Sequence, residues 1–327
     1  MEQPFPKPQD KYPVLYLKDT DLPLPQHVVN NKTRYAYFKT IARGGKCIIE
    51  SAKDFHLSRV VAYKSLKPEL ADDPFENQRF LREARVTAML QHPNTIPVYE
   101  LSRDNRGHLY FTMKLVEGST LREILNGEAD IDDWGQTPLR RMVDVLIQVG
   151  HALDYAHSHG VVHRDVKPGN ILLGPFGEVL LLDWGLAKVW GMATDEDSPL
   201  DPLTKAEPSL TGQGSLQGTV LYMSPEQIEE SPDLDHRSDV YSVGATLYEV
   251  LTGEEMIERG TLHVMMTAVL EGKVIPPSER APDRDIPEEL EQICLRSVAR
   301  NPEDRYASAH DLLAALQTWS DTDLEGT

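Results

Sequence analysis

The sequence predicts an α+β fold in two parts, a small strand-rich part followed by a larger, mainly helical part. Two observations predict it. Apolar residues alternate along short stretches between positions 34 and 115, whereas beyond position 118 they recur at helical spacing along longer stretches. We therefore expect an N-terminal extension (1–33), a strand-rich lobe (34–115), a helical lobe (116–320) and a C-terminal tail (321–327).

The strand-rich lobe is expected to be a small antiparallel sheet that carries one main helix. Turn residues at Gly44-Gly45 and at Asp54–His56 divide the first long strand-like region into three strands. Strand-like alternation is found at 14–17, 35–66, 96–101 and 108–115.

The helix of this lobe has a clear N-terminal signal. Asp73 is a good N-cap, Pro74 suits the first helical position, and Glu76 is placed to close a capping box. The helix is expected to end near Leu90, before the breaker His92-Pro93-Asn94.

Amphipathic periodicity dominates the second part of the chain. Leu139, Val143, Leu146, Val149 and Leu153 recur at the spacing of one helix face. Helices are expected at 120–125, 139–157, 239–251, 261–270, 287–299 and 307–319.

Charge is distributed unevenly, and this restricts the classes of partner. The net charge is −19, and residues 116–327 carry 39 acidic against 15 basic residues. This argues against nucleic-acid binding, which needs clustered Lys and Arg. It favours basic protein partners, although an acidic surface that aids solubility is the simpler explanation. Residues 34–115, with 14 basic and 9 acidic residues, would better receive an anionic small ligand.

The sequence favours a cytoplasmic protein. Its two cysteines, Cys47 and Cys294, suit a reducing compartment. No basic N-terminal patch precedes an apolar run, and no run approaches the ~20 apolar residues of a transmembrane helix. We expect no membrane segment in this chain.

Two charges interrupt apolar faces in the first lobe. Lys64 shares a strand face with Ala62 and Leu66, and Glu83 shares a helix face with Phe80. Because an unpaired buried charge is costly, the pattern favours a Lys64–Glu83 ion pair. The alternatives are a Lys64 side chain that reaches water and a Glu83 side chain paired with a neighbour on its own helix.

A predicted hairpin brings polar side chains together in the second lobe. Apolar stretches at 171–173 and 179–182 flank the turn 174–177. Antiparallel pairing places Asn170, before the first strand, beside Asp183, after the second, and Asp165 lies on the loop that enters the same end. Carboxylate and amide oxygens suit Mg²⁺ when phosphate completes its ligands. The alternative is that these residues only cap turns.

These residues, in this order, resemble the eukaryotic-like Ser/Thr protein kinase family, especially its bacterial members. The resemblance covers about 34–320. Its motifs are Val61–Lys64, Glu83, His163-Arg164-Asp165 with Lys167 and Asn170, Asp183-Trp184-Gly185 (Trp in place of the usual Phe), Ser224-Pro225-Glu226 with Arg305, and His236–Asp239.

The resemblance implies a bilobal protein-kinase-like fold and transfer of the γ-phosphoryl group of ATP to Ser/Thr hydroxyls of proteins. Asp165 would accept the proton of the substrate hydroxyl, and Lys167 would stabilise the transferring group. Lys64, held by Glu83, would contact the α- and β-phosphates. The metal ligands would be Asn170 and Asp183, with Mg²⁺ as the ion and Mn²⁺ as its alternative.

The resemblance also implies a nucleotide site at the link between the lobes. Met113 would be the gatekeeper, and backbone groups of Lys114 and Val116 would bind adenine. The ring would lie between Ala62 and Leu172. Ile49 would also contact the nucleotide.

The phosphate loop departs from the family pattern. In place of Gly-x-Gly-x-x-Gly the chain has Ala42-Arg43-Gly44-Gly45-Lys46-Cys47. This raises a second hypothesis, a pseudokinase scaffold with little turnover. A third, a small-molecule phosphotransferase, is disfavoured by Ser224-Pro225-Glu226 and Asp239. Cys47 is expected to fill space above the phosphates rather than act as a redox switch.

The resemblance suggests control by phosphorylation of the segment 183–226. Arg164 would bind a phosphate on this segment, and Thr211 and Ser215 are the candidate phosphosites. Thr219 is instead expected to bond Asp165 or Lys167.

Overall fold

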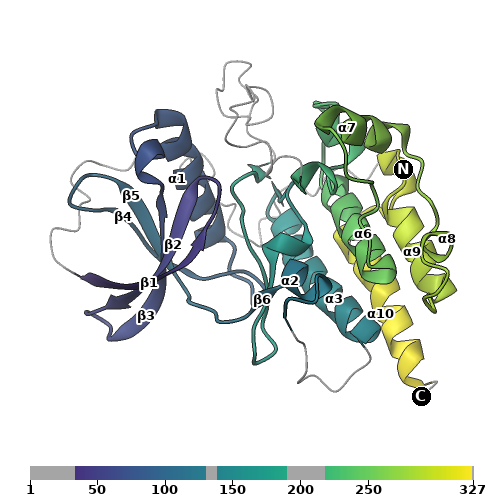
Figure 1. Cartoon of the computed structure of the whole chain (residues 1–327), viewed down its shortest axis with the longest axis horizontal. Helices are drawn as coiled ribbons and strands as arrows, with labels where there is room; N and C mark the ends of the chain where they lie inside the picture. The colour runs from purple at the N-terminus through teal and green to yellow at the C-terminus, as the bar shows by residue number, and fades with distance from the viewer. Residues whose placement is uncertain (1–33, 130–137, 190–217, 326–327) are drawn as a thin grey trace.

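The computed structural model describes residues 34–129, 138–189 and 218–325, and it has the two expected lobes. A sheet with one long helix forms the first lobe, and a group of helices forms the second (Figure 1). The α+β class is therefore confirmed. The expected strand at Val14–Leu17 lies outside the described residues.

The first lobe is a five-stranded antiparallel sheet in the order β1-β2-β3-β5-β4. Its register aligns Ala42, Ile49, Lys64 and Phe111 across β1, β2, β3 and β5. The next row on the same face of the sheet, two residues along β3 and β5, contains Ala62 and Met113. Both predicted turns of the first three strands are present. The strands are β1 (Tyr35–Arg43), β2 (Cys47–Asp54), β3 (Arg59–Leu66), β4 (Val98–Arg103) and β5 (Leu109–Met113).

Helix α1 (Pro74–Met89) packs against β3, β4 and β5 and follows a 3₁₀ turn, η2 (Pro68–Leu70). As predicted, Asp73 caps it by accepting hydrogen bonds from the backbone N–H groups of Phe75 and Glu76. The predicted capping box is wrong. The N–H of Asp73 already donates to the Leu70 carbonyl, so the Glu76 side chain pairs with Lys46 instead.

The second lobe is built around α6 (Arg237–Thr252), which is buried along nearly its whole length. Helix α3 (Pro138–Ser158) packs against both α6 and α10 (Ala309–Glu325). The other helices are α2 (Leu121–Leu125), α5 (Pro225–Ile228), α7 (Leu262–Glu271), α8 (Pro277–Arg280), α9 (Glu288–Ser297) and the 3₁₀ turn η4 (Pro302–Asp304).

The predicted end of the last helix at Trp319 was wrong. Helix α10 continues to Glu325, through most of the segment expected to be a tail. The Ser320 hydroxyl accepts a hydrogen bond from Arg140 and donates to Asp144, both on α3. These contacts and the burial of Trp319 hold the polar last turns against the lobe.

Three short antiparallel pairings face the first lobe. The predicted hairpin is present as β8 (Ile171–Leu173) and β9 (Val179–Leu181), with β6 (Ser119–Thr120) beside β8. Strand β7 (Val161–Val162) pairs with β10 (Lys188–Val189), and η3 (Pro168–Asn170) leads into β8.

The hairpin is attached to the first lobe. The Leu181 N–H donates to the Asn94 carbonyl at 2.9 Å, and Thr95 forms a bridge with Leu181. Leu182 packs against the apolar cluster between the sheet and α1. In the part of the chain that the structure describes, no helix combines the length and the apolar composition that crossing a membrane requires.

Candidate active site

The carboxylate of Asp239, in the first turn of α6, holds the start of the loop 163–170 in place. This carboxylate accepts hydrogen bonds from the backbone N–H groups of His163 and Arg164, each at 2.8 Å, and it lies 2.8 Å from His157 Nε2. Arg164 has a φ of 70°, an unfavourable conformation for a residue with a Cβ. Such strain is tolerated where surrounding bonds fix the backbone, as Asp239 does here.

His163 connects this loop with the segment that contains Asp183. Its Nδ1 accepts from the Asp165 N–H, and its Nε2 donates to the Leu182 carbonyl at 3.0 Å. Burial lowers the pKa of His163. This agrees with a neutral ring in which one nitrogen accepts a hydrogen bond and the other donates one. The fully buried Trp184 packs edge-on against this ring. Trp184 therefore anchors the segment as a large apolar residue.

Asp165, Lys167 and Asn170 form one hydrogen-bonded group. The Lys167 ammonium lies 2.8 and 2.9 Å from the two Asp165 carboxylate oxygens. The Asn170 amide donates to the Asp165 carboxylate at 2.9 Å and to its backbone carbonyl at 2.8 Å. Lys167 also donates to the Thr219 hydroxyl at 2.7 Å, which is the contact predicted for Thr219. The loop therefore presents a fixed carboxylate beside an ammonium group.

Asp183 lies after β9, at the end of the hairpin where Asn170 precedes β8. The Leu182 N–H donates to the Asn170 carbonyl at 2.8 Å, so the two residues lie at the same end. Asp183 is solvent-exposed and has a φ of 62°. Its carboxylate accepts a hydrogen bond from the Gly185 N–H at 3.3 Å. The backbone therefore brings Asn170 and Asp183 to the same end of the hairpin, as predicted.

Lys64 and Glu83 form a buried ion pair between β3 and α1. They are 9% and 8% exposed, so the side chains lie inside the lobe as the alternation predicted. Burial alone would lower the pKa of Lys64, but the carboxylates of Glu83 and Asp183 outweigh it and raise the pKa. A Cβ built on Gly185 would lie 3.1 Å from the Asp183 carboxylate and 3.7 Å from the Glu83 carboxylate, so the ion pair of the first lobe lies close to Asp183 of the second.

The two carboxylates have pKa values shifted in opposite directions. Burial raises the pKa of Asp165, with a further increase from Asp183 and an opposing effect of Lys167. Desolvation would also raise the pKa of Asp183, but Lys64 and then Lys167 lower it below its ordinary value. Pairs of carboxyl groups separated in this way are typical of acid–base sites. Asp165 is better suited to hold a proton, and Asp183 to keep its charge.

The donor set fits a divalent metal that is shared with a ligand. Asn170 uses its amide nitrogen within the protein, and no described residue donates to its side-chain oxygen. Asp183 is exposed and its pKa is lowered, so its carboxylate is available in the charged form. The described residues contain no cluster of three or more His, Cys, Asp or Glu side chains that could hold a metal alone. A divalent metal held by Asn170 and Asp183 would take its remaining oxygens from water or from a bound phosphate.

The residues expected to contact the nucleotide occur on one sheet face and at the link. Ala42, Ile49, Ala62 and Met113 belong to the two aligned rows that face the α1 side. Leu172 lies on β8 in the other lobe and is half-buried. The Lys114 N–H donates to the Pro97 carbonyl at 2.9 Å, so the backbone nitrogen of Lys114 is already bonded within the first lobe. Val116 is half-buried at the link.

The expected phosphate loop is a short turn between β1 and β2. The Gly44 N–H donates to the Cys47 carbonyl at 3.0 Å, which closes the turn. A Cβ at Gly45 would meet nothing within 4 Å, and one at Gly44 would be 3.7 Å from the Cys47 oxygen. Burial raises the pKa of the Cys47 thiol to about 12, so it is protonated, as expected of a space-filling residue.

Of the regulatory candidates, Thr211 and Ser215 lie outside the described residues. Arg164 is only 6% exposed, and its backbone carbonyl accepts a hydrogen bond from the Gln227 side chain. Gln227 and His157 are positioning residues that the sequence analysis missed. The expected Glu226–Arg305 pair is present, with two bonds of 2.6 and 2.8 Å.

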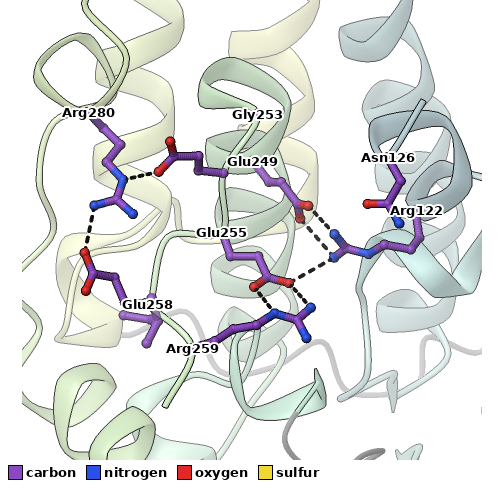
Figure 2. Close-up of a pocket in the computed structure, with 10 residues that line it drawn as sticks. Arg122, Asn126, Glu249, Gly253, Glu255, Glu258, Arg259 and Arg280 are labelled. Carbon is purple, nitrogen blue, oxygen red and sulfur yellow. Dashed lines mark hydrogen bonds and ion pairs between the residues drawn. The ribbon is translucent and has the colours of Figure 1, made fainter. Parts of the chain in front are cut away.

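A pocket of about 380 Å³ is lined mainly by α2, α6 and the loop that follows α6, and Figure 2 shows its side chains. Arg122 on α2 pairs there with Glu249 on α6, and both contact the Tyr222 hydroxyl. This network fixes the end of the segment that approaches Lys167. The pocket is lined by Arg122, Asn126, Glu249, Gly253, Glu254, Glu255, Ile257, Glu258, Arg259 and Arg280.

Comparison with known families matches residues 35–316 to the protein kinase domain. The chain belongs to the protein kinase family. The match spans both lobes and every group described above, so the α+β architecture is the bilobal kinase fold. The family uses ATP and a divalent metal.

Curated relatives of this kinase chain are bacterial enzymes. The serine/threonine-protein kinase PknD of Protochlamydia amoebophila is 36% identical over 296 residues, which are 87% of this chain and 30% of the relative. PknD of Chlamydia trachomatis serovar D is 33% identical over 308 residues, 90% of this chain and 32% of the relative. The chain thus spans about a third of the length of these relatives.

Proposed function

We propose that this kinase chain transfers the γ-phosphoryl group of ATP to Ser and Thr hydroxyls of proteins, with Mg²⁺ as its metal. The observation that carries the proposal is the Asp165 carboxylate, fixed by Lys167 and Asn170 at the end of the hairpin that bears Asp183. The nucleotide would lie between the first lobe, 34–115, and the second lobe, which begins at 116 and includes α10.

Each side chain has a role that follows from its contacts. Asp165 would orient the substrate hydroxyl and accept its proton, for which its raised pKa is suitable. Lys167, bonded to both Asp165 and Thr219, would stabilise charge on the transferring phosphoryl group. Lys64 would bind the α- and β-phosphates, and Glu83 would keep its ammonium in place.

Asn170 and Asp183 would hold the metal, which when bound would neutralise charge on the phosphate oxygens. Asn170 is fixed for this role, because its amide nitrogen is bound to Asp165 and its oxygen is left for the ion. Asp183 contributes a carboxylate whose lowered pKa keeps it charged.

The test is transfer of label from γ-labelled ATP to Ser or Thr in a protein substrate or in the chain itself. Asp165→Asn and Asp183→Asn should each abolish transfer while the thermal unfolding curve keeps its shape. Transfer that persists in both folded variants would contradict these roles.

The alternative is a pseudokinase that binds nucleotide without useful turnover, and it depends on the phosphate loop alone. The other chemical positions, Lys64, Glu83, Asp165, Asn170 and Asp183, are all present, which supports activity. A thermal-shift titration with Mg²⁺-ATP beside the transfer assay separates the two. Stabilisation by nucleotide without any transfer would identify the pseudokinase.

We favour basic protein substrates and control through phosphorylation of the segment 183–226. Residues 116–327 carry 39 acidic against 15 basic residues, and the pocket beside Tyr222 has four glutamates and three arginines. A lower KM for a Ser peptide with flanking Arg than for one with flanking Glu would support this preference. Phosphosite mapping after incubation with ATP tests autophosphorylation at Thr211 and Ser215. We propose a cytoplasmic location, where ATP is available.

A further inference from the structure

Helix α1 presents two acidic side chains to the sheet, and the proposed mechanism assigns a role to only one of them. Glu76 and Glu83 are seven residues apart, so they lie on the same face of the helix, about 10 Å apart along its axis. Phe80 lies between them on this face, where it is 2% exposed and packs against Phe111. Glu76, at 9% exposure, is nearly as buried as Glu83, at 8%. The interface between α1 and the sheet therefore holds a second buried acidic group.

Each of these carboxylates pairs with a lysine of the sheet. Glu83 binds Lys64 on β3, and Glu76 binds Lys46, which lies in the turn between β1 and β2. A carboxylate as buried as that of Glu76 needs a cation, because an unpaired buried charge is costly. Arg79 lies farther from this carboxylate, with its Nη1 atom 4.0 Å from Oε1 of Glu76. Lys46 is therefore the main partner of Glu76.

The turn that carries Lys46 lies at the edge of the sheet. Residues 42–46 are all exposed, and β1 is an edge strand. The backbone attaches the turn to β3 through the Lys67 N–H, which donates to the Lys46 carbonyl at 2.8 Å. Helix α1, in contrast, packs against β3, β4 and β5. The Lys46–Glu76 pair thus connects the helix to a part of the sheet outside these three strands.

The same turn is where the chain departs from the glycine pattern of the family. Ala42 and Cys47 stand at two of the three glycine positions. Glycine lets backbone N–H groups approach phosphate closely, and a side chain restricts the conformations that allow this approach. A turn with less backbone freedom adapts less readily to a bound nucleotide, so its position has to be set in advance. A side-chain contact to a long helix can set it.

We propose that the Lys46–Glu76 ion pair latches the β1–β2 turn to α1 and so positions the turn over the phosphates of the nucleotide. The inference rests on the proposed function, because it takes the nucleotide to lie between the lobes. Lys46 acts as a positioning residue and not as a phosphate ligand, since Glu76 holds its ammonium group. Because Glu83 holds Lys64 from the same helix, α1 sets the positions of the turn and of the Lys64 ammonium together.

Binding of Mg²⁺-ATP to the full chain tests the proposal, with Kd measured by isothermal titration calorimetry. Lys46→Met and Glu76→Gln should each raise Kd by about fivefold, because a turn that is no longer fixed must be ordered on binding. The double variant should bind no more weakly than either single variant, since both act through one ion pair. Lys46→Arg keeps the pair and should bind within about twofold of the unmodified chain.

Two exposed residues supply matched controls. Lys39→Met on β1 and Glu69→Gln in η2 remove the same charges at exposed positions of the same lobe, and each should leave Kd unchanged. Thermal unfolding without nucleotide is measured beside binding. A positioning role predicts weaker binding at an unchanged unfolding midpoint, with affinity restored in Lys46→Arg, and a purely structural role does not.

Equal Kd values in the unmodified chain and both single variants would overturn the proposal. Weaker binding in Lys46→Met with unchanged or tighter binding in Glu76→Gln would assign Lys46 to a direct phosphate contact, and it would also overturn the latch. Additive losses in the double variant would do the same. Because binding is measured and not turnover, the expected pattern in a chain that transfers no phosphoryl group would support the latch and contradict only the proposed function.

Discussion

The carboxylate of Asp239 accepts a hydrogen bond from the backbone N–H of Arg164 at 2.8 Å, and this contact joins the central helix of the second lobe to the loop that carries Asp165. It also holds Arg164 at a φ of 70°, a conformation that costs about 1–3 kcal/mol without such support. The position of Asp165 is therefore set by a residue that has no direct role in the chemistry.

Replacing this carboxylate by an amide should disturb both stability and activity. Asp239→Asn introduces an NH₂ group that faces backbone N–H donors, so at least one buried donor loses its acceptor. We expect the free energy of unfolding to fall by about 2–4 kcal/mol. Urea titration measures this loss, and the transfer assay should show a lower kcat. Asp321→Asn, at an exposed position of α10, is the control, and equal stability of both variants would refute this role for Asp239.

Because Lys64 and Glu83 form one ion pair, we expect their substitutions to have non-additive effects on kcat/KM for ATP. Lys64→Met should lower kcat/KM for ATP by about 100-fold, because it removes a charged contact to the phosphates. Glu83→Gln should have a smaller effect, and the double variant should be no worse than Lys64→Met alone, since both act through one ammonium group. Steady-state kinetics on all three variants, with the exposed Glu69→Gln as control, provide the measurement. Independent, additive losses would argue against the pair.

Substitutions of two glycines should have different effects: one at Gly44 should change KM for ATP, and one at Gly118 should change stability. Gly44→Ala has room for its Cβ, so the unfolding midpoint should stay the same while KM for ATP rises by about fivefold, as the methyl group obstructs the approach of phosphate. Gly118→Ala would place its Cβ 2.0 Å from the Leu173 carbonyl oxygen at a φ of +159°. We expect it to lose about 2 kcal/mol or more of stability. An unchanged KM for Gly44→Ala would show that the turn does not approach the nucleotide.

The opposed carboxyl pKa values give a pH prediction. Asp165 must be ionised to accept a proton, so kcat/KM should fall as pH decreases through a pKa above the ordinary Asp value of about 3.9. Lys167 lowers this pKa, so Lys167→Met should move the acid limb to higher pH in addition to reducing kcat. Lys167→Arg keeps the charge and should leave the limb near its original position. A limb that shifts to lower pH in Lys167→Met would contradict the sign of this interaction.

Local sequence signals predicted the elements well. Alternation over 35–66, the Asp73 N-cap and the turn 174–177 each depend on neighbouring residues, and each is present in the fold. The Lys64–Glu83 pair was also predictable, because each charge interrupts an apolar face on its own element.

Contacts between distant parts of the chain could not be read in the same way. Asp239 and Arg164 are 75 positions apart, and the residues around Asp239 carry no sequence signal that its carboxylate will accept two backbone N–H hydrogen bonds. Glu76 is at the correct spacing for a capping box with Asp73, but its carboxylate pairs with Lys46, 30 positions earlier. The Asp73 N–H already donates to another acceptor. Helix α10 continued past Trp319 because of Ser320 contacts on α3, another long-range cause.

The most direct test of the account is a crystal structure of the chain with Mg²⁺ and a non-hydrolysable ATP analogue. We expect a cation about 2.1 Å from a carboxylate oxygen of Asp183 and from the side-chain oxygen of Asn170, with the Lys64 ammonium on the α- and β-phosphates. A nucleotide bound without metal at these two residues, or a cation held elsewhere with Asn170 still bonded only to Asp165, would contradict it.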